Sequence, residues 1–315
     1  MGNRFCFSGS YGIVVNRENS LLPRFEAIAC LRGSRKTRRR KMELKHVKAA
    51  FYSATGNTEK VVKAIGQAIA EGLGLPFEAF DFTLPANRQG VLSYGPEDLV
   101  VVGTPVYAGR IPNKMLPYFQ SGLEGNGALA VPVVTFGNRN FDNGLIELRN
   151  ELEAHGFHTV AGAGVAASHV FTDKLAPGRP DEADMAALQE FCRKVCEKVQ
   201  GLQEIPAPVA VRGDDPVGPY YTPLGTDGKP AVFLKAKPKT DPAKCDNCGI
   251  CAKVCPMGSI PADAPQTVTG ICIKCQACIK KCPQQAKYFD DPAFLSHVAM
   301  LETNYARRAE AEWFL

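Results

Sequence analysis

Apolar positions follow two different periods along the first two thirds of the chain. Short continuous apolar stretches alternate with stretches in which apolar residues recur every three to four positions. In residues 58–72, for example, Val61, Val62, Ile65 and Ile69 share one face of an amphipathic helix. Alternation of strand and helix with continuously apolar strands predicts a parallel sheet covered on both faces by helices.

The pattern places the expected elements as follows. Strands are expected at residues 46–52, 77–82, 99–103, 131–136 and 157–166. Helices are expected at residues 58–72, 143–155 and 181–199. The resulting fold class is an α/β doubly wound parallel sheet.

The chain changes character after residue 201. Residues 201–244 are rich in Pro and Gly and contain one strand-like stretch, residues 231–235. A cysteine-rich segment follows, and an amphipathic helix is expected from Pro292 to about Glu312. The expected organisation is a basic extension at 1–41, an α/β domain at 42–201, a linker at 202–240, a small α+β domain at 241–291 and a C-terminal helix within 292–315.

Composition and charge argue against a membrane-spanning protein and against a nucleic-acid-binding protein. The chain has 315 residues, of which 45% are hydrophobic, and no apolar stretch reaches the ~18 residues that span a bilayer. Residues 1–41 hold 10 of the 37 Lys and Arg and 2 of the 32 Asp and Glu. The remainder is therefore mildly acidic, which argues against nucleic acid as a partner and suits docking to a basic protein surface.

The basic extension allows three interpretations. It is a disordered tail, an upstream start whose natural beginning is Met42, or an arm that binds nucleic acid or tethers the chain to a membrane. Residues 1–30 lack the continuous apolar region of a signal peptide, because Arg17, Glu18 and Arg24 interrupt them. A cytoplasmic location is therefore expected.

Eight of the twelve cysteines form two copies of one motif near the C-terminus. The motif is Cys-x2-Cys-x2-Cys-x3-Cys-Pro, at residues 245–256 and 272–283. Zinc also binds Cys-x2-Cys pairs, but this overlapping series with a Cys-Pro end, repeated twice, is typical of bacterial ferredoxins with [4Fe–4S] clusters. The other four cysteines are expected to be free thiols: Cys6, Cys30, Cys192 and Cys196.

The same spacing predicts the ligands of two clusters. Three closely spaced thiolates bind one cluster, and the fourth cysteine of each motif binds the other cluster. The first cluster is assigned to Cys245, Cys248, Cys251 and Cys282. The second cluster is assigned to Cys272, Cys275, Cys278 and Cys255.

The first expected strand runs into a short loop of small and hydroxyl residues, Ser53 to Thr58, and a helix follows at once. Backbone N–H groups, a helix N-terminus and hydroxyls in such a loop favour a phosphate group. The loop has one Gly and no Lys, so it is not a Walker A motif, which needs Gly-x4-Gly-Lys. It resembles the first loop of flavodoxin, which implies that it holds the phosphate of FMN.

Two further loops follow strands where a doubly wound fold places its ligand. Residues 104–112 offer Tyr107, and residues 137–142 offer Phe141, as aromatic contacts for the flavin ring. His169 is expected to be structural. The expected flavin-binding residues are Ser53, Ala54, Thr55, Gly56, Asn57, Thr58, Thr104, Pro105, Val106, Tyr107, Ala108, Gly137, Asn138 and Phe141.

Residues 42–315 taken together resemble the flavodoxin–ferredoxin fusion proteins of anaerobic bacteria and archaea. The resemblance rests on both cysteine motifs and on residues 53–58, 105–112, 137–139, 176–181, 237–241 and 287–292. It implies a flavodoxin-like domain that binds FMN, followed by a ferredoxin domain with two [4Fe–4S] clusters. It implies no defined substrate.

The expected function is electron transfer between FMN, the two clusters and redox partner proteins. FMN exchanges one or two electrons and each cluster exchanges one, so the chain can convert between the two. One alternative is an FMN-dependent reductase or oxidase that acts on a small molecule and is fed by the clusters. The other is an iron–sulfur redox sensor with a vestigial flavin domain.

Overall fold

The structure is a computed structural model that describes residues 43–315. The basic extension at 1–41, the start at Met42 and the thiols of Cys6 and Cys30 therefore lie outside the described residues. All described residues belong to one structural unit.

The centre of the fold is a sheet with five principal parallel strands in the order β2–β1–β4–β6–β8. Their bounds are β1 His46–Phe51, β2 Phe77–Asp81, β4 Asp98–Pro105, β6 Leu129–Phe136 and β8 Gly162–Ala166. Numbered along the chain, this order is 2-1-3-4-5, that of flavodoxin-like doubly wound sheets. The strand predicted at 157–166 is divided, because a short β7 (His158–Thr159) pairs with the start of β6 before β8 begins.

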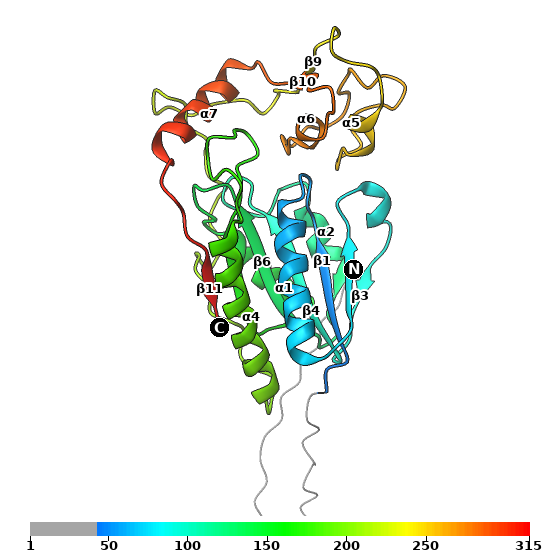
Figure 1. Ribbon diagram of the computed structural model, residues 1–315, viewed down its shortest axis with the longest axis vertical. Helices are drawn as coiled ribbons and strands as arrows, with labels where there is room; N and C mark the ends of the chain where they lie inside the picture. The colour runs from blue at the N-terminus through cyan, green and yellow to red at the C-terminus, as the bar shows by residue number, and fades with distance from the viewer. Residues whose placement is uncertain (1–42) are drawn as a thin grey trace, which may run out of the picture. The chain divides into compact units, whose positions relative to one another are not determined.

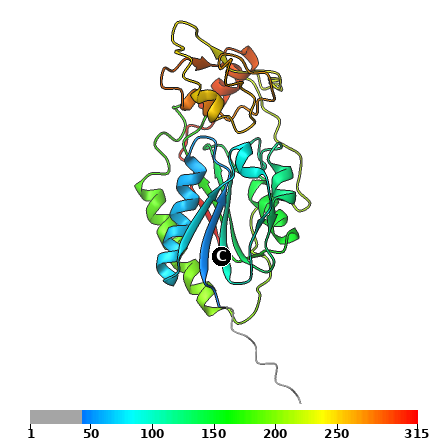
Figure 2. The same ribbon diagram turned by 90° about the vertical axis from the view of Figure 1, so that its right-hand side faces the viewer.

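Helices cover both faces of this sheet, as Figures 1 and 2 show. The helices on one face are α1 (Asn57–Leu73) and α4 (Glu182–Gly201), and those on the other are α2 (Leu116–Ser121) and α3 (Gly144–Ala154). The short connecting elements are η1 (Pro85–Arg88), β3 (Leu92–Ser93) and β5 (Leu123–Glu124), of which β3 and β5 pair with each other.

Strand β4 shows why helices must cover both faces of the sheet. Leu99 and Val101 point into the core beneath α1 and α4, whereas Val100 and Val102 point into the core on the other face. All four side chains are fully buried. Because side chains alternate across a strand, a continuous apolar run gives two buried faces.

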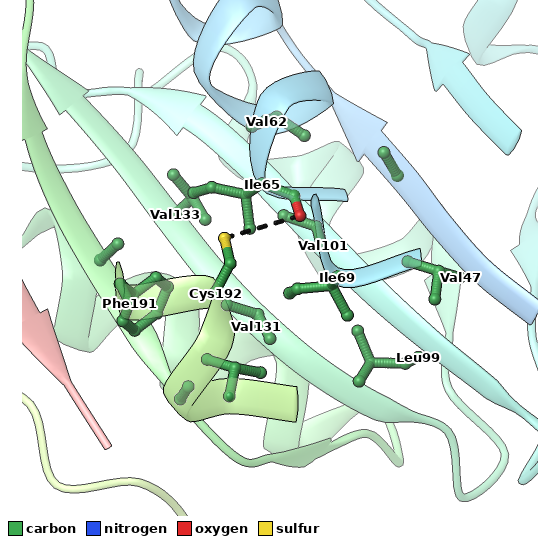
Figure 3. Packing of buried hydrophobic residues seen from close by; sticks show 14 of the residues in the cluster. Val47, Val62, Ile65, Ile69, Leu99, Val101, Val131, Val133, Phe191 and Cys192 are labelled. Carbon is green, nitrogen blue, oxygen red and sulfur yellow. Dashed lines mark hydrogen bonds between the residues drawn. The ribbon is translucent and has the colours of Figure 1, made fainter. Parts of the chain in front are cut away.

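The core between α1 and α4 accounts for two cysteines outside the motifs (Figure 3). The Cys192 Sγ lies 3.8 Å from the carbonyl oxygen of Ile65, and the Cys196 Sγ lies 3.7 Å from that of Ile69. Burial raises the pKa of Cys192 to about 12. Neither forms a disulfide within residues 43–315, and both serve as small apolar residues of the core.

The cysteine-rich segment forms a small α+β fold with an internal repeat. Its elements are β9 (Lys239–Thr240), β10 (Lys287–Tyr288), α5 (Ile250–Lys253) and α6 (Ala277–Lys280). Gly249 and Gln276 precede the two helices in the same left-handed conformation, with φ of 72° and 65°. The repeated sequence motif therefore gives a repeated backbone.

The end of the chain differs from the prediction. Helix α7 (Pro292–Asn304) stops well before Glu312, and residues Glu312–Phe314 form a strand, β11, that pairs antiparallel with β8. The residues between α7 and β11 have good helix propensity. However, pairing with the open edge of β8 and stacking of Trp313 on Phe191, with ring centroids 5.0 Å apart, favour the strand at residues 312–314 over a longer helix.

The linker also differs from the prediction. Residues 231–235 form no strand, although a β-bridge joins Leu224 and Pro230 just before them. Within residues 43–315, no helix combines the length and the apolar character needed to cross a bilayer.

Candidate functional site

The loop between β1 and α1 is built around Ser53 and Gly56. The Ser53 N–H donates to the Thr83 hydroxyl at 2.7 Å, and the Ser53 hydroxyl accepts from the N–H of Glu59 at 3.0 Å. Gly56 adopts a φ of 100°, a left-handed conformation that favours glycine, and it caps the helix. These bonds hold the loop at the N-terminus of α1.

The side chains of this loop divide into engaged and free groups. The Thr58 hydroxyl is buried against that of Thr135 at 2.7 Å, and the Asn57 amide donates to the carbonyl oxygen of Ser168 at 2.9 Å. No hydrogen bond of the Thr55 hydroxyl occurs within the described part of the chain. The Thr55 hydroxyl and the first-turn N–H groups of α1 other than that of Glu59 therefore fit an anion such as a phosphate.

The second predicted loop, after β4, turns tightly at Ala108 and Gly109. Both residues have positive φ, 50° and 80°, and the N–H groups of Tyr107 and Arg110 donate to each other's carbonyl oxygens at 2.9 and 3.2 Å. This is the pattern of a two-residue hairpin turn. The buried Glu147 binds the Arg110 guanidinium and raises its pKa. The position of Tyr107 is thereby fixed by α3.

Tyr52 and Tyr107 lie side by side at the end of the sheet. Burial raises the pKa of both phenols well above the usual value, and the neighbouring Cys275 raises them further. The Tyr52 hydroxyl interacts with that of Tyr107, but it is one of the few buried side-chain groups in residues 43–315 without a hydrogen bond of ordinary geometry. Such a group marks a place where a further polar partner would be stabilising.

The side chains of the third predicted loop, after β6, make their contacts within the protein. The Asn138 amide donates to the carbonyl oxygens of Tyr305 and Arg307, both at 2.6 Å. Phe141 is fully buried and packs against Phe136, with centroids 5.5 Å apart. Both stay predicted flavin contacts, but the structure also gives each of them another role.

Gly137, in the same loop, lies under the ring of His169. A Cβ at Gly137 would come within 2.4 Å of that ring. The His169 Nδ1 accepts from the N–H of Phe171 at 3.1 Å, and burial lowers the pKa of His169 to about 4. His169 is thus a neutral packing residue.

Four cysteines line one cavity of the small fold. They are Cys245, Cys248, Cys251 and Cys282. Cys282 comes from the second sequence motif, so the fold brings the end of one motif to the start of the other. Cys248 is exposed and Cys251 is buried.

The other four cysteines line a second cavity. They are Cys255, Cys272, Cys275 and Cys278. Burial raises the thiol pKa of Cys275 and of Cys278 to about 12, because a thiolate is poorly solvated there. The positive charge of bound iron would offset that cost. Among the described residues, no three His, Cys, Asp or Glu side chains are grouped to hold a single metal ion.

The two cysteines that cross between motifs receive matching hydrogen bonds. The N–H of Ser259 donates to the Cys255 Sγ at 3.3 Å, and the N–H of Ala286 donates to the Cys282 Sγ at 3.3 Å. Each donor lies four residues after its cysteine, so the turn that follows Cys-Pro directs its N–H group towards the sulfur. N–H groups directed at sulfur stabilise negative charge there.

Several residues of the site carried no clear signal in the sequence. Thr83 and Thr135 contact the first loop from other strand ends, and Tyr52 directly follows β1. Arg88 donates to the carbonyl oxygens of Phe82, at 2.9 Å, and of Pro256, at 2.6 Å. Only the position of Tyr52, directly before the loop, could have indicated a role.

Comparison with known proteins adds a family match for the C-terminal part. A family described as a 4Fe-4S binding domain matches residues 237–260, which contain the first cysteine motif. Among curated proteins, none matches the chain.

Solved structures similar to the chain include two flavodoxins and one larger enzyme. A flavodoxin from the domain Archaea is 14% identical over 49% of this chain and 99% of its own, with a TM-score of 0.34. The flavodoxin of Streptococcus pneumoniae TIGR4 is 19% identical over 49% of this chain and 99% of its own, with a TM-score of 0.35. Rubredoxin oxygen:oxidoreductase from Desulfovibrio gigas is 15% identical over 51% of this chain and 37% of its own, with a TM-score of 0.37.

The strand order, rather than these scores, assigns the first half of the fold. The chain thus combines a flavodoxin-like α/β fold with a ferredoxin-type 4Fe–4S binding domain at its C-terminal end.

Proposed function

We propose that the chain is an electron-transfer protein that passes electrons between FMN and two [4Fe–4S] clusters, and onward to redox partner proteins. The observation that carries this proposal is the division of eight cysteines into two sets of four, each around its own cavity. Four thiolates per site is the donor set of a [4Fe–4S] cluster.

The two cavities support the crossed ligand assignment. In the proposal, Cys245, Cys248, Cys251 and Cys282 form the first set and bind the first cluster. Cys255, Cys272, Cys275 and Cys278 form the second set and bind the second cluster. Since each motif supplies one ligand to the other set, either cluster alone would tie the two halves of the small fold together.

The first loop supports FMN as the flavin. The Thr55 hydroxyl and the N-terminus of α1 would bind its phosphate, and the ring of Tyr107, fixed through Arg110 and Glu147, would lie against the flavin. When bound, FMN supplies exchange of one or two electrons, and the clusters supply exchange of one.

The protein residues around the cysteines would adjust the clusters. The N–H groups of Ser259 and Ala286 offset negative charge on sulfur, which favours the reduced form. Lys287 is buried beside the first set and donates to the carbonyl oxygen of Pro265 at 2.6 Å. Its charge lowers the pKa of Cys251 against the stronger effect of burial, which raises it.

Anaerobic purification followed by iron, sulfide and flavin quantification tests the proposal. We expect about eight iron and eight sulfide per chain from two [4Fe–4S] clusters, and one tightly bound FMN. The Cys255→Ala variant should lose iron, since Cys255 is a ligand, and should keep FMN.

The control is Cys192→Ala, which removes a core thiol that lines neither cavity, and it should keep full iron content. Iron for a single cluster in the unsubstituted protein, or failure to bind added FMN, would contradict the proposal.

A further inference from the structure

The two cysteine sets differ in what surrounds them. Cys275, of the second set, and Ala277, two residues later, belong to the same buried cluster as Tyr52 and Ala54, at the end of β1. Tyr107, in the second predicted flavin loop, packs against this cluster. The second cavity therefore adjoins the loops that are proposed to hold FMN.

A series of hydrogen bonds also connects the second cavity with the first flavin loop. The Arg88 guanidinium donates to the carbonyl oxygen of Pro256, next to Cys255 of the second set, at 2.6 Å. It also donates to the carbonyl oxygen of Thr83, whose hydroxyl accepts from the N–H of Ser53 in the first loop. Arg88 thus fixes the second set relative to the phosphate loop.

The first set lacks such contacts. Cys248 is exposed, as are its neighbours Asp246 and Asn247. In the described part of the chain, the hydrogen bonds of residues 245–251 are all made within residues 241–284. The first set therefore reaches solvent through Cys248, in the exposed loop 246–248.

We infer that the two clusters act in a fixed order, with the second set exchanging electrons with the flavin and the first set exchanging them with the partner. This inference rests on the proposed function. A one-electron redox protein docked on the exposed loop 246–248 would donate one electron through the first set, and the second set would pass it on to the flavin. Two such transfers, with protons from solvent, would supply the two electrons of flavin reduction, and both would reverse with an oxidised partner.

Tyr52, Tyr107 and Arg88 are positioning residues in this order. They hold the second set against the flavin loops and exclude water between them, since Tyr52 is fully buried. Electron transfer slows steeply as the distance between redox groups grows, so a packed contact favours the second set.

Stepwise removal of the clusters tests the order. The purified protein, with iron and flavin already quantified, is exposed anaerobically to a chelator and an alkylating agent, and the alkylated cysteines are identified by peptide mass spectrometry. We expect Cys245, Cys248, Cys251 and Cys282 to be alkylated first, and the second set later. Simultaneous or reversed loss would overturn the inference.

The half-depleted protein then shows which cluster serves which partner. It should still pass an electron between the remaining cluster and FMN after photoreduction, followed by the cluster's electron paramagnetic resonance signal. It should exchange electrons more slowly than the intact protein with an added, separately purified two-cluster ferredoxin. Unchanged exchange with that ferredoxin, or loss of the internal transfer, would overturn the inference.

A pair of arginine variants adds a matched comparison. Arg88→Ala should bring alkylation of the second set forward and leave that of the first set unchanged. Arg193→Ala, which breaks ion pairs on the exposed face of α4, should change neither. Equal rates in Arg88→Ala and Arg193→Ala would contradict the positioning role of Arg88. A failed proposed function would show earlier, as missing iron or flavin before any challenge.

Discussion

The polar residues of the predicted flavin loops fall into two groups, those available to a ligand and those hydrogen-bonded to other parts of the protein. Within residues 43–315 the Thr55 hydroxyl makes no hydrogen bond, whereas Thr58 and Asn138 give their hydrogen bonds to other parts of the chain. Burial decides between the two, because a buried polar group without a partner is costly. The residue type alone therefore could not separate ligand-binding from structural positions within the same loop.

His169 gives a prediction at this scale. Its pKa is lowered to about 4, mainly by burial and further by His297, Lys280 and Arg139. The folded state thus disfavours the protonated ring, and the unfolded state binds the proton more readily. The stability contributed by this group should be full above the unfolded pKa of ~6.5 and should be lost as the pH falls towards 4.

Histidine C2 hydrogen exchange, followed by mass spectrometry, measures this pKa directly in the loaded protein. A value well below 6 is expected for His169. The loss of stability between pH 6.5 and 5 should be on the order of 1–2 kcal/mol, discounted for the partial exposure of the ring. A His169→Gln variant with the same pH dependence as the natural protein would contradict this account.

At the scale of elements, the last strand is the least expected feature. β11 pairs with β8 through Glu312, Trp313 and Phe314, and Arg212 binds the Glu312 carboxylate at 2.8 Å. The cysteine-rich fold is therefore held between two segments that both belong to the α/β fold. Sequence periodicity could not show this, because a strand of three residues has no measurable period.

Replacement of Trp313 tests the contribution of β11. Trp313→Ala removes the stacking on Phe191 and should lower the free energy of unfolding by about 2 kcal/mol, less than for a fully buried Trp. Leu315→Ala, at a half-exposed position beside it, should stay within about 0.5 kcal/mol. Urea unfolding of the α/β fold, followed by circular dichroism, is the measurement, and equal effects of the two variants would argue against a role for β11.

At the scale of the whole molecule, the two folds are stabilised in different ways. The α/β fold has two extensive apolar cores, whereas Ile260 is the only large aliphatic side chain buried within residues 241–291. A module of that size without such a core depends on its metal ligands. In the proposed function, the cysteines would therefore be the main structural links of the small fold as well as its redox sites.

Removal of iron should unfold the small cysteine-rich fold and leave the α/β fold intact. After oxidation and chelation, residues 241–291 should lose most of their protection from amide hydrogen exchange, while β1, β4 and β6 keep theirs. Protein treated with buffer alone is the control. Retained protection in residues 241–291 would show that the module folds without its clusters.

The sequence by itself determined the features that depend on local periodicity and spacing. Apolar runs such as residues 131–136 predicted the central strands, and their order is confirmed as flavodoxin-like. Repeated cysteine spacing predicted a ferredoxin-type domain, and the 4Fe–4S family match confirms it for the first motif. Such patterns persist in any environment because strand and helix periods follow from backbone geometry.

Only the tertiary structure decided the relations between distant residues. It directed residues 312–314 to the edge of β8 instead of into a helix, and it brought Tyr52, Arg88 and Cys275 together at the end of the sheet. These contacts depend on which surfaces remain unpaired after the sheet has formed, and that information is spread over the whole chain. No local pattern contains it.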